Sequence, residues 1–356
     1  MEPEVADAIR AHASLPALAP ANAGQLPEGA AAVLAPLPDG ACPAFDRPGG
    51  NLCSIQRALG HERLPASCRH FPRVALLEQD AIRVTLSHFC PTAASMLFRP
   101  DVGRPAVLHD AAGIADRNEH EGFDARHTIP PLLRPGVAMD AGTCRLWEQY
   151  LLDSFDRDGR TPEGGLAAAA LGAEQIRGWA AGQESLEAHT RRVLLAAEAA
   201  LNRGGGWQMT FPGASRLHQS AVDSVPPGLA APGLQAGADE ADREWVVPRW
   251  AAFSRPLGRY LAARSFAAWS AYQGQGLRTQ VAMLAVALAV VRVEAARGAA
   301  QASRTLDDTL LHAAIRAADL LLHHLSDSQR LVKRHAGVER GPAAAFLDAI
   351  GLEAAG

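Results

Sequence analysis

Residues 42–91 read CPAFDRPGGNLCSIQRALGHERLPASCRHFPRVALLEQDAIRVTLSHFCP and contain four of the five cysteines of the chain. Ten, fourteen and twenty-one residues separate successive thiols. Four thiolates can hold either a tetrahedral zinc ion or an iron–sulfur cluster. We therefore predict one metal site, and its ligands are Cys42, Cys53, Cys68 and Cys90.

The spacing of these cysteines leaves the kind of site open. No Cys-x-x-Cys pair of the zinc-ribbon type is present, so the fold must bring the four thiols together. Two other interpretations remain: small buried apolar side chains, as free cysteines often are, or disulfides. Disulfides fit poorly, because the first residues, MEPEVADAIR, are acidic and precede no apolar signal core. We expect a cytoplasmic protein with reduced thiols.

The segment between Cys68 and Cys90 has the pattern of a β-hairpin. Residues 73–77 and 82–86 are rich in strand-forming side chains and flank the polar turn Glu78-Gln79-Asp80. Such a hairpin would carry Cys68 and Cys90 towards each other. Pro91 is well suited to the first position of a helix, which we expect to run to about residue 98.

The same stretch resembles a known family. It is similar to the cysteine-cluster proteins described as zinc- or iron-chelating, and within them most like the flagellin lysine-N-methylase branch. That branch has the pattern C-x-I-x-x-x-L-G-x-x-x-L-x-x-x-C-x-x-[FY]-P-R, followed by a hairpin and S-x-x-C-P-x-A-A. The matching residues are Cys53, Ile55, Leu59, Gly60, Leu64, Cys68, Phe71, Pro72, Arg73, Ser87, Cys90, Pro91, Ala93 and Ala94.

The resemblance implies a [4Fe–4S] cluster and S-adenosylmethionine, which would donate a methyl group to lysines of flagellin or another protein. The family also carries an earlier C-x(n)-C-x-x-CC motif, and residues 1–41 contain no cysteine. The sequence has neither E/D-x-G-x-G-x-G nor Cys-x3-Cys-x2-Cys, so the methylase expectation depends on the resemblance alone. The alternative is a non-catalytic zinc or iron–sulfur protein whose helical domain binds a protein partner.

Composition indicates an ordinary globular protein. Of 356 residues, 48% are hydrophobic and 20% are charged, with a formal net charge of −4. A slightly acidic chain with 5% aromatic residues has no overall basic field for nucleic acid and few rings for base stacking. The longest apolar run, residues 281–291, is shorter than the roughly 20 residues that cross a bilayer, so we expect no membrane segment.

The predicted fold class is mainly α. We expect a C-terminal helical bundle, preceded by a small cysteine-rich metal-binding segment that contains the β-hairpin. Apolar residues in 277–291 and 311–325 step by three and four, which predicts two antiparallel helices of similar length. The predicted regions are a flexible Ala/Pro-rich N-terminus at 1–41, the cysteine cluster at 42–98, a loop-rich connector at 99–140, and an α-helical domain at 141–356 with a flexible loop at about 212–240.

Several other residues could in principle bind metal, and we predict that they do not. Cys144 is expected to be a lone structural thiol in the first turn of a helix capped by Thr143. A further helix is expected over residues 172–201. We expect ordinary surface or packing roles for the histidines nearest the cysteines and those of the C-terminal helices: His70, His88, His312, His323, His324 and His335.

Overall fold

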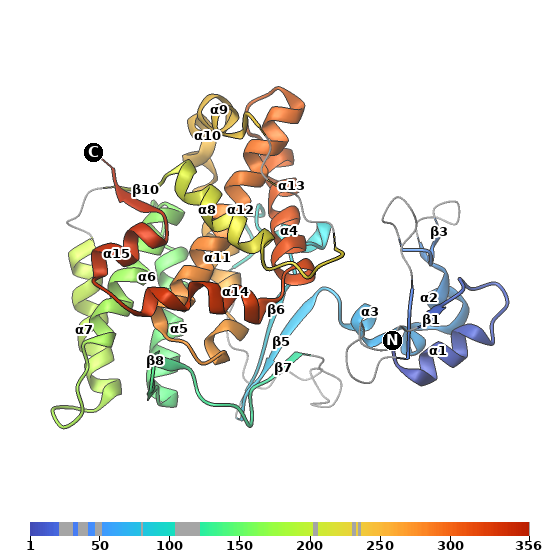
Figure 1. Cartoon of the computed structure of the whole chain (residues 1–356), viewed down its shortest axis with the longest axis horizontal. Helices are drawn as coiled ribbons and strands as arrows, with labels where there is room; N and C mark the ends of the chain where they lie inside the picture. Colours follow the sequence, from blue (N-terminus) through green and yellow to red (C-terminus); the bar gives the residue numbers. More distant parts are fainter. Residues whose placement is uncertain are drawn as a thin grey trace. The chain divides into compact units, whose positions relative to one another are not determined.

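The computed structural model shows a mainly helical chain with a few small sheets, as predicted (Figure 1). It forms two compact units, which are considered separately below: unit 1 is Met1–Phe71 with residues 114–121, and unit 2 is Pro72–Gly113 with Gly122–Gly356. The boundary after Phe71 divides the region 42–98 that we expected to be one. The structure describes residues 1–20, 31–34, 42–46, 52–79, 81–103, 122–201, 206–229, 233 and 236–355.

Unit 1 is small and has its own core. The apolar face of its first helix packs against Ile55 and Leu64. The expected short helix at 5–13 is therefore present with different ends, Pro3–Arg10, while residues 21–30 and 35–41 of the expected flexible N-terminus lie outside the described residues. The elements are α1 (Pro3–Arg10), β1 (Ala19–Pro20), β2 (Ala32–Val33), β3 (Phe45–Asp46), β4 (Leu52–Cys53), α2 (Ser54–Leu59), η1 (His61–Arg63) and α3 (Ala66–His70).

Unit 2 begins with the predicted hairpin. Strands β5 (Arg73–Leu77) and β6 (Ile82–Leu86) pair antiparallel, with Arg73 opposite Leu86, which confirms the prediction; Asp80 of the expected turn lies outside the described residues. A third strand, β7 (Gly122–Asp124), joins β5 in parallel. Gly122 is required there, because a Cβ atom at this position would overlap the backbone of β5.

The expected loop-rich connector at 99–140 also contains two-stranded structure. Strands β8 (Leu132–Arg134) and β9 (Val137–Ala138) form a short antiparallel pair, and residues 104–121 lie outside the described part. Strands of two or three residues leave almost no alternating pattern in a sequence, so the connector could not be assigned beforehand.

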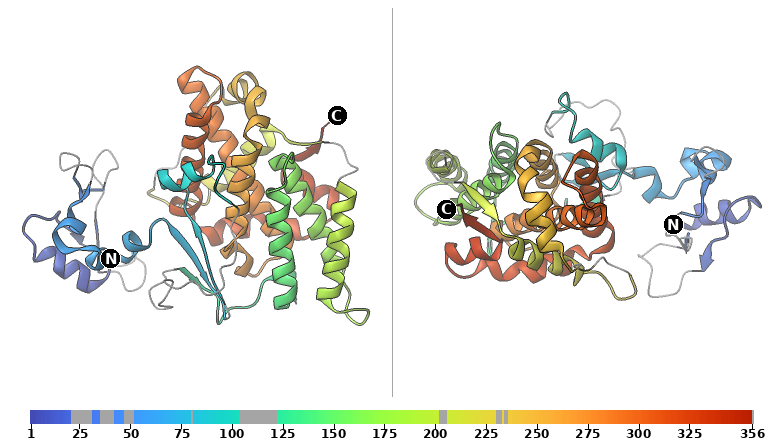
Figure 2. Two further views of the ribbon diagram at one scale, coloured as in Figure 1. Left: turned by 180° about the vertical axis from the view of Figure 1, so that it is seen from behind. Right: turned by 90° about the horizontal axis from the view of Figure 1, so that it is seen from above.

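Twelve helices and several shorter turns make up the rest of the described part of unit 2 (Figures 1 and 2). The α-helices are α4 (Pro91–Met96), α5 (Ala141–Phe155), α6 (Pro162–Arg177), α7 (Leu186–Leu201), α8 (Phe211–Val222), α9 (Ala238–Ala241), α10 (Val247–Trp250), α11 (Ser254–Ser265), α12 (Leu277–Ala302), α13 (Asp308–Asp319), α14 (Ser328–His335) and α15 (Ala343–Ala349). The remaining elements are β10 (Trp207–Met209), β11 (Leu352–Ala354), the π-helices η2 (Asp242–Val246) and η5 (Leu320–Leu325), and the 3-10 helices η3 (Ala251–Phe253), η4 (Trp269–Tyr272) and η6 (Ala336–Glu339).

Helix α12 is the centre of unit 2. It packs against α6, α8, α11 and α13, and both predicted apolar stripes are helical and in contact. Its 26 residues are, by length and composition, enough to cross a membrane. Its most apolar 18-residue stretch, however, is 100% buried within the protein. The sequence had indicated only an eleven-residue core, because Arg278 and Arg292 interrupt the apolar run although both are buried.

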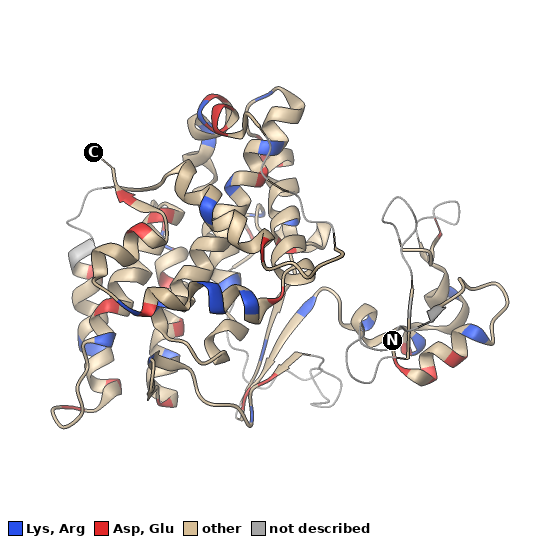
Figure 3. Cartoon of the chain, in the orientation of Figure 1, with Lys and Arg blue, Asp and Glu red and all other residues tan. Residues whose placement is uncertain are grey.

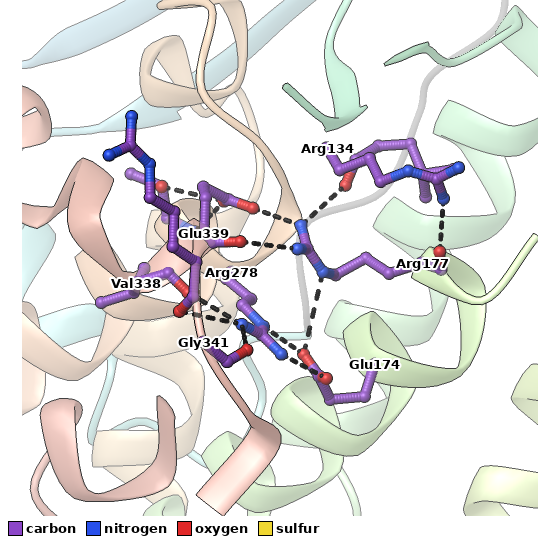
Figure 4. A network of polar contacts seen from close by, with 10 residues as sticks. Arg134, Glu174, Arg177, Arg278, Val338, Glu339 and Gly341 are labelled. Carbon is purple, nitrogen blue, oxygen red and sulfur yellow. Dashed lines mark hydrogen bonds and ion pairs between the residues drawn. The ribbon is translucent and has the colours of Figure 1, made fainter. Parts of the chain in front are cut away.

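The buried start of α12 is held by an ionic network (Figure 4). Oε1 of Glu339 accepts hydrogen bonds from the backbone N of Thr279 at 2.8 Å and from its hydroxyl at 2.9 Å. Arg177 forms an ion pair with the other oxygen of Glu339. Arg278 binds Glu174 through two bonds of 2.5 and 2.6 Å. A carboxylate from η6 therefore caps the start of α12 by binding Thr279, sixty residues earlier in the chain.

Three helix boundaries differ from the sequence prediction. The expected helix at 172–201 is two helices, α6 and α7, and α6 begins where Thr161 accepts a bond from the N–H of Gly164. Residues 212–222 of the loop expected at 212–240 belong to helix α8, whose start is capped by Thr210 and contains Pro212. Asp140, not Thr143, caps α5, because its Oδ1 accepts the N–H of Thr143 at 2.8 Å.

Basic and acidic side chains both occur over the helices of unit 2 (Figure 3). Many form local pairs four residues apart, such as Arg191 with Glu187 on α7 and Arg243 of η2 with Asp239 of α9. This mixture agrees with the small net charge of the sequence.

Candidate metal centre

Unit 1 contains three of the four predicted ligands. Cys53 lies in β4 opposite Phe45 of β3, and Cys42 lies in the turn before β3, where the N–H of Phe45 bonds to its carbonyl at 3.0 Å. Cys68 lies in α3. Cys42 and Cys68 are exposed, and Cys53 is half-buried at the N-terminus of α2.

The thiols of Cys42 and Cys53 lie within electrostatic reach of Cys68. The protein around the Cys68 sulfur removes part of its water and so raises its pKa, a hydrogen bond with Ser67 opposes the rise, and the nearby thiols of Cys42 and Cys53 add to it. Negative charge on one thiol thus makes ionisation of the next less favourable. A soft cation bound among them would reverse this effect, since it favours the thiolate forms.

The remaining ligand, Cys90, lies in unit 2. The structure therefore brings Cys42, Cys53 and Cys68 into one neighbourhood and places Cys90 in the other unit. In the part of the chain that the structure describes, no group of three His, Cys, Asp or Glu side chains is close enough to hold a metal ion.

Cys90 occupies the position that precedes helix α4. Its carbonyl accepts the N–H of Ala94 at 3.0 Å, and Pro91 is the first helical residue, as the sequence predicted. The helix ends at Met96, two residues before the expected end. Cys90 is half-buried, and its own N–H bonds to the carbonyl of Ser87 at 3.3 Å, which closes a turn.

The segment 87–91, which we call the Cys90 loop, is fastened to the C-terminal helices of unit 2. Bonds reach it from α13 and from η5, more than two hundred residues further along the chain. These contacts are Ser87 Oγ to His324 Nε2 at 3.1 Å, His88 N to Asp319 Oδ2 at 2.5 Å, Arg316 Nε to the carbonyl of Phe89 at 3.1 Å, and His312 Nε2 to the carbonyl of Pro91 at 3.0 Å.

Asp319 is the centre of this attachment and is fully buried. The hydroxyl of Tyr260 donates to its Oδ1 at 2.8 Å, and Arg264 Nη1 lies 3.7 Å from the same oxygen. Burial alone would raise the pKa of Asp319, but His323, the hydrogen bond from His88 and the charge of Arg264 outweigh it and lower the pKa. Asp319 is therefore a buried carboxylate with hydrogen bonds on both oxygens.

Two histidines from η5 complete the surroundings of Asp319. Burial and the charge of Arg264 lower the pKa of His323 to about 3, so this side chain is neutral near pH 7. Its Nε2 contacts Arg264, whereas its neighbour His324 contacts Ser87. The π-helical turn after Asp319 directs the two adjacent histidines to different partners.

The sequence analysis missed Asp319, Tyr260 and Arg264. A signal for Asp319 was present, because it lies four residues after Ile315 and three before Leu322 within the apolar stripe. A lone acid in such a stripe is an unusual buried group that needs partners. The partners themselves come from α11 and the Cys90 loop and have no local signature.

Cys144 lies in the first turn of α5, as expected. Burial raises the pKa of its thiol to about 12, and the carboxylates of Glu78 and Asp140 add to the rise. It remains a neutral thiol at physiological pH, which is the state of an unreactive packing side chain.

Comparison with known proteins yields no relative: no family model, no curated protein and no solved structure matches the chain.

Proposed function

We propose that this chain is a metal- or iron–sulfur-binding protein with Cys42, Cys53, Cys68 and Cys90 as ligands. The observation that carries the proposal is that the thiols of Cys42 and Cys53, both in unit 1, lie near enough to Cys68 to raise its pKa. Thiolates prefer soft metals, and four of them suit either a [4Fe–4S] cluster or zinc.

Metal analysis after purification without oxygen tests this proposal. A [4Fe–4S] protein would be brown and contain iron and acid-labile sulfide in equal amounts, about four of each per chain. One zinc per colourless chain would identify the zinc form. Protein that takes up neither metal, even after anaerobic reconstitution with iron, sulfide or zinc, would refute the proposal.

From the family resemblance we further propose methyl transfer from S-adenosylmethionine to lysine residues of flagellin or another protein. A lysine must lose its proton before its nitrogen can attack the methyl group, so a base or a desolvating pocket is needed near the substrate. Incubation of the metal-loaded protein with flagellin and S-adenosylmethionine, followed by mass analysis of flagellin, tests this activity.

The composition of the chain limits methylation of the enzyme itself in that assay. Lys333 is the single lysine in 356 residues, so methylation of the enzyme itself has one side-chain acceptor. A Lys333→Arg variant removes it. Added mass on flagellin with both forms of the enzyme would support the activity.

A metal-loaded protein without methyl transfer would indicate the second proposed function, a structural metal site in a protein that binds a partner. The specific observation in its favour is that α13 and η5 hold the Cys90 loop by direct hydrogen bonds. Metal bound at Cys90 would then stabilise the conformation of the Cys90 loop and its hydrogen bonds to α13 and η5. A structural site contributes to folding free energy, so chelation would lower the melting temperature.

A further inference from the structure

Three arginines are buried in the part of unit 2 that the structure describes, and they differ in their partners. Arg278 pairs with Glu174 at 2.5 Å, and Arg292 pairs with Asp242 at 2.7 Å. Arg259, only 5% exposed, forms no ion pair within 4 Å with a described residue: Asp156 and Asp101 act on it only at longer range, and desolvation lowers its pKa. A buried cation without a counter-ion is costly, so its environment requires an explanation.

The hydrogen bonds of Arg259 use one side of its guanidinium. Nη1 donates to the carbonyl of Leu97 at 3.1 Å and to that of Arg99, where α4 ends. Nε is buried and has no partner, and Nη2 makes no hydrogen bond to any described residue. Nε and Nη2 form one edge of the planar group, and this edge matches the two oxygens of a carboxylate.

Arg259 lines a pocket of about 200 Å³ within unit 2. Its walls come from β6, α4, α11 and the residues that follow α4, and they are mostly apolar. Thr85, His88 and Arg259 are the polar side chains of the lining, and Nδ1 of His88 is also buried without a hydrogen bond. The main apolar wall residues are Val84, Leu86, Ala93, Met96, Leu97 and Val102.

We propose that this pocket binds a small carboxylic acid with an apolar body, whose carboxylate pairs with the Nε–Nη2 edge of Arg259. The apolar walls bury the body of the ligand, and its single negative charge supplies the close counter-ion that Arg259 lacks. A phosphate dianion fits less well, because one arginine in an apolar lining offers too few donors. This binding site is separate from the proposed thiolate ligands and requires no metal.

Calorimetric titration of the full chain with hexanoate and with hexanamide tests the proposal. The two probes share an apolar tail, and only hexanoate carries the charge. We expect hexanoate to bind at least about tenfold more tightly, as a charge-assisted bidentate pair should. Equal affinity, no binding of hexanoate at millimolar concentration, or tighter binding of inorganic phosphate would each overturn the proposal.

Two variants of α11 test whether Arg259 causes the preference for hexanoate over hexanamide. Arg259→Lys retains a positive charge but loses the bidentate edge, so the preference for hexanoate should fall about tenfold. Arg255→Lys is the matched control, because Arg255 is exposed one turn earlier on α11 and should leave the preference unchanged. An unaltered preference in Arg259→Lys would contradict the assignment.

A third variant covers the case in which Arg259→Lys fails to fold. Ala93→Leu fills the pocket from α4 and leaves Arg259 in place, and circular dichroism checks that the variant is folded. Hexanoate binding should be lost, and its retention would refute the site. Bound metal should be the same in all three variants, so failure here is distinct from failure of the metal-site proposal.

Discussion

The backbone N–H of His88 donates to Oδ2 of Asp319 at 2.5 Å, which joins two positions 231 residues apart. Asp319 is completely buried, and Tyr260 and Arg264 approach its other oxygen. The loop that carries Cys90 is therefore positioned by a carboxylate at the end of α13. The conformation of a loop at residues 87–91 therefore depends on the C-terminal helices.

Replacement of Asp319 by asparagine should destabilise unit 2 strongly. The amide cannot accept hydrogen bonds on both sides, and it leaves Arg264 without its carboxylate in a buried site. We expect a loss of about 3 kcal/mol in the free energy of unfolding, measured by urea denaturation. Asp239→Asn, in an exposed pair with Arg243, is the control and should change stability by less than about 1 kcal/mol. Similar losses in both variants would contradict the assigned role of Asp319.

Replacement of Cys68 by serine should remove bound metal and destabilise unit 1 together. Serine lacks the thiolate that a soft metal requires, and a metal site contributes directly to the folding of a small unit. Metal content per chain and the melting temperature measure the two effects. Cys144→Ser should keep the full metal content, because Cys144 is a neutral thiol in α5. Full metal content in Cys68→Ser would exclude Cys68 as a ligand.

Replacement of Glu339 by glutamine should weaken the start of α12. The neutral side chain can still accept a bond from Thr279, but it no longer compensates the charge of Arg177 (Figure 4). We expect a loss of about 2–3 kcal/mol in unfolding free energy. Glu187→Gln removes an exposed pair with Arg191 and should cost about 0.5 kcal/mol or less. If the two losses were equal, Glu339 would not be a buried helix cap.

His335 should make stability depend on pH. Its Nε2 lies 2.8 Å from Oγ of Ser220, and burial together with the charge of Arg334 lowers its pKa from 6.5 to about 4. As pH falls below about 6.5, the unfolded chain binds this proton first. The stabilisation is thus present above pH 6.5 and is lost as pH falls towards 4, by at most about 3 kcal/mol.

Replacement of His335 by glutamine tests this dependence, because glutamine can bond to Ser220 and does not titrate. The unfolding free energy of the variant should fall less than that of the original chain between pH 7 and pH 4. Denaturation at several pH values measures the difference. His127→Gln, at an exposed position, should follow the original chain. Parallel pH curves for His335→Gln and the original would show that folding does not lower the pKa of His335.

The cysteine site was only partly accessible from the sequence. The clustering of thiols and the family resemblance selected four cysteines, and three of them are neighbours in unit 1. The division of the chain after Phe71 had no sequence signal, because it depends on which segments share a core. The pocket beside Arg259 could not be predicted from the sequence either. Its lining combines β6, α4 and α11, and the lack of a close counter-ion can be recognised only when all neighbours of Arg259 are known.

The sequence by itself determined the local elements: the ends of strands β5 and β6, the helix start at Pro91, and the apolar stripes of α12 and α13. These follow from side-chain periodicity and from the fixed backbone of proline, which act over a few residues. Only the tertiary structure decided that Asp319 holds His88 and that Glu339 caps α12. Each pairing joins segments far apart in the chain, and buried charges find such partners only when the fold has removed water from around them.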